Sequence, residues 1–147
     1  MTDLAITQDT TGLWDISISP DGDFTLTDGF DTTLTTSVLC DRRATADEVT
    51  NPLRRRGWAG NTMNSDGFEM GSKLWLYSQS RMTNAAINGV KTAIADSLQH
   101  LVVSGAATSV GVIATNVGGS LVFEAVVTAI DGKVTRQSFD AWGNTGL

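Results

Sequence analysis

The sequence predicts an α+β fold: an N-terminal β-hairpin, two to three helices, and a C-terminal antiparallel β-meander with an exposed terminal strand. Short β-rich segments separated by glycine-containing turns lie near both ends of the chain. Between them, one long segment has apolar residues at the i, i+3, i+4 spacing of a helix. With 147 residues, 41% of them hydrophobic and 18% charged, the chain suits a single domain spanning residues 1–147.

The first third of the chain contains the predicted hairpin and a short helix. Residues 13–18 and 24–26 have the composition of strands and are separated by Pro-Asp-Gly-Asp at 20–23. Proline fixes φ at the first turn position, and Asp-Gly tolerates the conformation that follows. We expect a helix over 31–39 with Asp31 as its N-cap. This helix needs tertiary support because it is rich in weak helix formers.

The middle of the chain is predicted to be irregular. Residues 41–71 are rich in Asp, Asn, Gly and Arg and keep neither the helix period nor the strand period. A loop of this length is usually functional or disordered. Trp58 and Phe68 lie within it, and aromatic side chains in a loop usually attach it to the body of the protein or to a partner.

Helices are predicted in the part of the chain that follows this loop. One helical stretch begins at 74–77, and the longest helix runs from Thr83 or Asn84 to about 102 or 103, with Gly105 as its stop. The only histidine, His100, falls opposite the apolar stripe and is expected at the surface. The stripe consists of Ile87, Val90, Ile94, Leu98 and Leu101.

The C-terminal part of the chain has the pattern of a β-meander. Residues 108–117 and 120–130 flank Gly118-Gly119, which predicts a hairpin, and Asp131-Gly132 predicts a second turn. Residues 134–142 alternate without a strongly apolar face. We therefore expect an edge strand or extended arm at about 133–147. An exposed edge offers main-chain donors and acceptors to another chain, which is the basis of β-augmentation.

Charge is distributed unevenly along the chain. The formal net charge is −6, and a series of aspartates precedes the first basic residue, Arg42. An acidic protein is poorly suited to bind a phosphate backbone, so we expect no direct nucleic-acid partner. No apolar run is long enough to cross a bilayer, so we expect no membrane partner. The asymmetry suits stacking against copies of the chain or complementary neighbours, although solubility alone would also explain it.

The residue types that most catalytic sites require are scarce. There is one histidine and one cysteine, no Gly-x-Ser-x-Gly elbow and no Walker loop. The glutamates are Glu48, Glu69 and Glu124, two of which lie in the irregular loop. We therefore expect no enzymatic activity, no catalytic, cofactor-binding or metal-binding residues, and no cofactor.

Three motifs carry a resemblance to a known family. They are Asp-Arg-Arg-Ala at 41–44, Arg-Arg-Gly-Trp-Ala-Gly-Asn at 55–61 and Gly-Ser-Lys-Leu-Trp-Leu at 71–76. In this order, the chain resembles the Mu-type bacteriophage tail and baseplate proteins over about residues 20–142. That family is related to the T-even baseplate wedge protein that initiates the contractile sheath. The chain lacks the Glu-Pro-Arg motif of the T-even branch, and Asn-Pro-Leu-Arg at 51–54 is not equated with it.

The resemblance implies a structural baseplate subunit of a contractile tail that nucleates sheath assembly and contacts core wedge proteins. The implied partners are the tail sheath protein, the core baseplate wedge proteins, and tail tube or tube-initiator proteins, with six copies per ring expected. The implied location is the tail baseplate of the virion, after assembly in the bacterial host cytoplasm. The family's lysozyme-like label transfers no catalytic residue.

Two rival functions remain open. One is a tail-associated peptidoglycan hydrolase, which would require two carboxyl groups facing each other across a cleft. The other is a stand-alone module that captures extended peptides at its free sheet edge.

Two sets of residues are candidate interfaces. Arginine and tryptophan are enriched where interfaces carry most of their binding energy, which favours the loop for wedge and ring contacts. Alternatively, its arginines pair with local aspartates and Trp58 fills the core. The second set lies on the predicted strand at 134–142, which would bind the sheath protein. Alternatively, that strand is a self-contained edge of its own sheet. We expect a chain lacking residues 134–147 still to fold. The loop set is Asp41, Arg42, Arg43, Arg54, Arg55, Arg56 and Trp58, and the strand set is Val134, Thr135, Arg136, Gln137, Ser138, Phe139 and Trp142.

Overall fold

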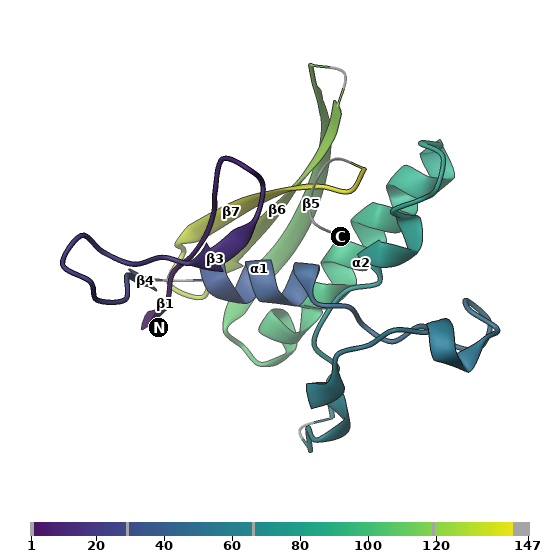
Figure 1. Ribbon diagram of the computed structural model, residues 1–147, viewed down its shortest axis with the longest axis horizontal. Helices are drawn as coiled ribbons and strands as arrows, with labels where there is room; N and C mark the ends of the chain where they lie inside the picture. The colour runs from purple at the N-terminus through teal and green to yellow at the C-terminus, as the bar shows by residue number, and fades with distance from the viewer. Residues whose placement is uncertain (1, 29, 66, 119, 143–147) are drawn as a thin grey trace.

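The computed structural model describes residues 2–28, 30–65, 67–118 and 120–142 and has the predicted α+β architecture (Figure 1). Gly29, Gly119 and the predicted arm residues 143–147 lie outside the described residues. None of the described helices combines the length and apolarity needed to cross a membrane. In chain order, the elements are β1 (Thr2–Leu4), β2 (Ile6–Gln8), β3 (Trp14–Ile16), β4 (Leu26–Asp28), α1 (Asp31–Leu39), the 3₁₀ helices η1 (Pro52–Arg54), η2 (Ala59–Thr62) and η3 (Leu74–Tyr77), α2 (Asn84–Val103), β5 (Ala107–Val117), β6 (Ser120–Ala129) and β7 (Val134–Asp140).

The N-terminal hairpin is present and is larger than predicted. An antiparallel bridge between Ile18 and Phe24 flanks the predicted turn. The sequence analysis assigned no strand to residues 2–8, yet β1 pairs with β4 and β2 pairs with β3. Residues 2–8 therefore lie between the two arms of the hairpin and bind both.

Helix α1 begins and ends where the sequence predicts, but its N-cap differs. Phe30 occupies the cap position, and Asp31 lies in the first turn, where its carboxylate accepts a hydrogen bond from the Thr27 hydroxyl. The helix obtains the tertiary support it needs from Leu34 and Val38, which are completely or almost completely buried.

Helix α2 packs against β5 and β6 of the β5–β6–β7 sheet, and α1 packs against β7 (Figure 1). Helix α2 begins as predicted, because the Thr83 hydroxyl caps the amide of Ala86. Its buried side chains pack against alternate residues of the sheet, which point to the same side of the strands. The resulting core consists of Phe30, Leu34, Val38, Leu74, Val90, Ile94, Leu98, Leu101, Ala107, Phe123, Ala125, Val127, Phe139 and Ala141.

The β-meander has the strand order β5–β6–β7, so β7 lies at one edge of this sheet. Thr135 and Phe139, on the inner face of β7, are buried, although neither face of this strand is strongly apolar in sequence. Among the described residues, no strand pairs with the far side of β7. The predicted terminal edge strand is therefore observed.

Candidate functional site

The irregular loop from 41 to 71 is closed at its base by main-chain pairing. Asp41 and Ser72 form a parallel bridge, in which the Arg42 amide donates to the Ser72 carbonyl at 2.8 Å and the Ser72 amide donates to the Cys40 carbonyl at 2.8 Å. The Ser72 hydroxyl also donates to the carbonyl of Val38 on α1 at 2.6 Å. The loop therefore leaves the body through a fixed base and extends as two lobes, which carry η1 and η2 (Figure 1).

Three of the predicted arginines brace the loop by donating to its own carbonyl groups. Arg42 binds the carbonyl of Glu69 at 2.7 Å. Arg43 binds two carbonyls, those of Arg56 at 3.1 Å and of Pro52 at 3.2 Å, and Arg55 binds those of Val49 and Thr50 at 2.8 and 3.0 Å. The guanidinium fork suits this task because it presents several donors in one rigid plane.

Arg56 instead joins the loop to η3. Its Nη1 lies 3.2 Å from Asp41 Oδ2, and its guanidinium lies 4.9 Å from the centre of the Trp75 ring. Trp75 in turn donates from Nε1 to the carbonyl of Arg42 at 3.0 Å. The pairing of an arginine with a local aspartate, which the sequence left open as an alternative, is therefore present at Arg56.

Trp58 does not fill the core. Its backbone amide donates to the carbonyl of Asp41 at 2.9 Å, which fixes it at the loop base, while the residue is 47% exposed. The ring covers Gly60 so closely that a Cβ added there would lie 2.2 Å from it. Arg54 is also exposed, on η1. The structure thus links Asp41, Arg43, Arg56 and Trp58 directly, with Trp58 and Arg54 facing solvent.

A groove of about 690 Å³ lies between this loop, η3 and α2, and three carboxylates line it: Glu48, Glu69 and Asp96. Both carboxylate oxygens of Glu48 accept from Lys73 Nζ, at 3.0 and 2.8 Å. Hydrogen bonding to Lys73 lowers the pKa of Glu48, and the Thr45 amide acts in the same direction. A glycosidase acid needs a raised pKa, so Glu48 is prepared for an ion pair and not for proton donation.

His100, near the end of α2, lies beside Phe68 of the loop and is less exposed than the sequence suggests. Phe68 stacks on the imidazole with ring centres 5.0 Å apart and an interplanar angle of 11°. Burial lowers the pKa of His100, and the positive charge of Arg42 adds to this, while a contact with the Ser97 carbonyl opposes it. Neutral imidazole is therefore the form that the folded chain favours.

Acidification is expected to destabilise the fold through His100. The unfolded chain binds this proton more tightly, so the free energy of unfolding decreases as the pH falls below the ordinary value of 6.5. The test is the urea midpoint as a function of pH for the wild type and for His100→Gln. The decrease below 6.5 should be shallower in the variant, and parallel curves would contradict this role of His100.

The outward main-chain groups of β7 follow from its register. The Ala129 amide donates to the Lys133 carbonyl at 2.8 Å, and hydrogen-bonded pairs alternate along an antiparallel ladder. Because Gln137 faces Ala125 and Phe139 faces Phe123, these two residues bond to β6. The amide and carbonyl of Arg136 and Ser138 therefore point away from β6.

Several members of the strand set contact the rest of the chain. Thr135 and Phe139 are buried beneath the sheet. Arg136 Nη1 pairs with Glu124 on the outer face at 2.8 Å. Trp142 lies against Phe123, with ring centres 5.9 Å apart, and donates from Nε1 to the Ser80 carbonyl at 2.8 Å. Val134 and Ser138 are exposed.

Sequence reasoning did not single out Glu48, Lys73 or the pairing of Asn61 with Met70. Asn61 accepts from the Met70 amide and donates to its carbonyl, both at 2.9 Å, which closes the η2 lobe. Lys73 and Trp75 lie in the Ser-Lys-Leu-Trp motif that carried the resemblance. That motif was therefore the available signal for the contacts that attach the loop.

The chain has clear similarity to known phage proteins. A family model described as phage protein GP46 matches residues 30–134. The chain is 39% identical to Mu-like prophage FluMu protein gp46 of Haemophilus influenzae over 87 residues, which cover 58% of this chain and 64%, just under two thirds, of that protein. It is 34% identical to baseplate protein gp46 of Escherichia phage Mu over 146 residues, 96% of this chain and 97% of that protein. The predicted resemblance to Mu-type phage proteins is therefore confirmed, and the chain belongs to the phage protein GP46 family.

Proposed function

We propose that this protein is a structural subunit of a contractile-tail baseplate, acting as one domain, and that it initiates the sheath by β-augmentation. The observation that carries the proposal is the outer edge of β7, where the amides and carbonyls of Arg136 and Ser138 point away from their own sheet. A strand of the sheath protein added there would be fixed in register by main-chain hydrogen bonds. The similarity to the Mu baseplate protein over nearly the whole chain supports a baseplate location in the virion.

The arginine-braced loop is the proposed surface for core wedge proteins. Its internal bonds hold the loop in one shape, so a partner would not have to order it on binding. Exposed Trp58 would then supply a rigid anchor, and the groove lined by Arg42 and Arg43 would receive polar groups of the wedge. In this arrangement six copies surround the tail tube or its initiator, following assembly in the host cytoplasm.

Replacing Trp58 with alanine should weaken incorporation of the subunit into baseplate wedges. A tryptophan hot spot contributes 2 kcal/mol or more, so we expect wedge affinity to fall more than about tenfold. The measurement is co-purification of tagged variants with baseplate intermediates. The thermal midpoint should change little, because the ring is not in the core.

Met63→Ala provides a matched control. Met63 belongs to the same loop and is 84% exposed, so its truncation removes apolar surface without touching the proposed anchor. Equal incorporation of the Trp58 and Met63 variants would remove Trp58 from the wedge contact.

A further inference from the structure

The N-terminal strands present an apolar face to solvent. Cross-strand partners in an antiparallel pair lie on the same face, as do alternate residues of one strand. Leu4 faces Leu26 and Ile6 faces Ile16 in two separate short ladders, and Ile18 faces Phe24 in an isolated bridge; these apolar pairs are together called here the N-terminal apolar face. Leu26, Phe24 and Ile18 are 60%, 55% and 64% exposed. So much exposed apolar surface on one small element indicates an interaction site.

This face borders a hollow into which a side chain can enter. The hollow has a volume of about 310 Å³ and lies between the N-terminal strands and α1. Its lining is largely apolar and includes Ile6, Trp14, Ile16 and Leu39. The face therefore borders a shallow, open depression.

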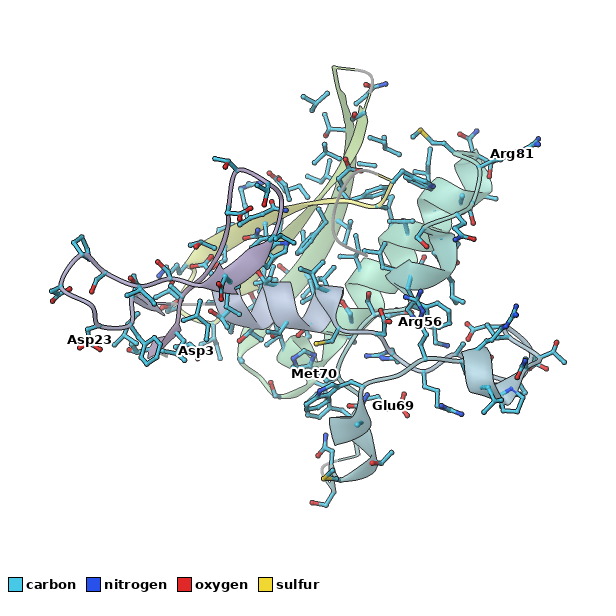
Figure 2. All side chains as sticks on the ribbon, in the orientation of Figure 1. Asp3, Asp23, Arg56, Glu69, Met70 and Arg81 are labelled. Atoms are coloured by element: carbon cyan, nitrogen blue, oxygen red, sulfur yellow. The ribbon has the colours of Figure 1, made fainter. Side chains whose placement is uncertain are left out.

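Acidic residues accompany this end of the molecule. Residues 1–31 contain seven aspartates and no lysine or arginine. Asp3 and Asp23 lie at the same end of the long axis as the N-terminal strands (Figure 2). An occupant of the apolar face would therefore combine an apolar side chain with neighbouring positive charge.

The η1 lobe of the same protein combines an exposed apolar side chain with positive charge. The tip of η1 presents Leu53, which is 94% exposed and thus the most exposed of the large hydrophobic residues described. Its amide is capped by the Asn51 side chain at 3.0 Å, so the tip has a defined shape. Residues 42–56 contain five arginines against Asp47 and Glu48. In Figure 1 the η1 lobe lies toward the right end of the long axis, whereas β1 and β4 lie toward the left end.

We propose that the η1 tip of one copy of this chain binds the N-terminal apolar face of the next copy, with Leu53 in the hollow beside α1. Arg54, adjacent to Leu53, would meet Asp23 in the turn beside Phe24, which sets the direction of the contact. Binding between two different surfaces is head-to-tail, and such contacts generate rings when the rotation between copies closes. The pairwise contact depends only on this chain; its closure into a ring rests on the proposed baseplate function.

Site-directed cross-linking of the isolated protein tests the contact. In a Cys40→Ser background, one protein carries Leu53→Cys and the other carries Ile18→Cys, and the two are mixed with a mild oxidant. A disulfide requires the two Cα atoms to lie within about 7 Å, so it reports the proposed geometry directly. The control replaces Ile18→Cys with Val103→Cys, which is 80% exposed at the end of α2.

The Leu53–Ile18 heterodimer should form about tenfold faster than the Leu53–Val103 heterodimer, because the proposed contact brings the first two thiols within disulfide reach and leaves the Val103 thiol to random encounter. Adding Arg54→Glu should slow the reaction, and adding Asp23→Arg to the Ile18→Cys protein should restore it. Equal rates for Ile18→Cys and Val103→Cys would overturn the proposal.

The cross-linking experiment tests the copy-to-copy contact independently of the proposed function. The mixture contains neither sheath nor wedge protein, so failure of sheath templating elsewhere does not change its result. Conversely, loss of the cross-link would refute the copy-to-copy contact and leave strand addition at β7 intact.

Discussion

Replacing Ser138 with proline is expected to stop sheath templating while the subunit remains folded. The Ser138 amide points away from β6, so proline removes no hydrogen bond within the sheet. It removes one donor from the outer edge and places a ring where an added strand would lie. The lost bond alone is worth about 1 kcal/mol and the steric conflict adds to it, so we expect templating to fall at least about tenfold. The measurement is the rate of sheath polymerisation on assembled baseplates.

Two further variants test the register behind this expectation. Ser138→Ala keeps the amide and should template normally. Gln137→Pro removes an amide that donates to β6. This variant should therefore unfold at a lower urea concentration than the wild type. Normal sheath growth from folded Ser138→Pro would contradict strand addition at this edge.

Deletion of residues 134–147, after which the sequence predicts that the chain still folds, would remove part of the core. Phe139 and Ala141 are each only 4% exposed and belong to the core. Removing them would uncover Phe123 and Val127 on β6, which are completely buried. The structure therefore argues against the expectation that the truncated chain folds, and a substitution confined to the outer edge replaces the deletion.

Elements with local signals were predictable from the sequence. The long helix has both a regular apolar stripe and a threonine cap, and α2 spans Asn84–Val103 as expected. The β-meander has Gly-rich turns at both reversals, and β7 emerges at the edge. In each case the residues that encode the element lie within it.

Elements that depend on distant partners were not predictable. Strands β1 and β2 have three residues each and no marked alternation, and they form because β4 and β3 provide ladders. Phe30 caps α1 without a side-chain bond, so no residue type marks it. Short strands and unmarked caps are set by tertiary context rather than by propensity.

The candidate site was predictable only as a set of residues. Clustered arginines and Trp58 identified the loop, but the carbonyl groups that Arg42, Arg43 and Arg55 bind carry no sequence signal. The sequence also left open whether Trp58 is buried, and its 47% exposure follows from the position of the loop base.

Replacing Gly71 with alanine is expected to open the base of the arginine loop. Gly71 has a φ of +109°, and an added Cβ would lie 2.7 Å from the Cys40 carbonyl oxygen and 2.9 Å from the Arg42 amide nitrogen. Both neighbours are main-chain atoms of the bridge, so they cannot move aside as a flexible side chain can. The conformational cost and the overpacking together suggest a loss of about 3 kcal/mol in the free energy of unfolding.

Gly67→Ala separates the two costs. Gly67 lies in the same loop with a φ of +78°, but nothing lies within 4 Å of its added Cβ. This variant should lose only the conformational part, about 1 kcal/mol. Urea unfolding of both variants measures the difference. Equal losses would show that the close approach at Gly71 is not what fixes the loop base.

The same pair of variants links the loop base to the proposed wedge contact. The Asp41 carbonyl receives the Trp58 amide, so a shift of the base displaces the exposed ring. Gly71→Ala should therefore reduce wedge incorporation even at temperatures where the core remains folded, whereas Gly67→Ala should not. Normal incorporation of a destabilised Gly71 variant would mean that the position of Trp58 does not depend on the base. The wedge contact would then have to be sought on another surface of the subunit.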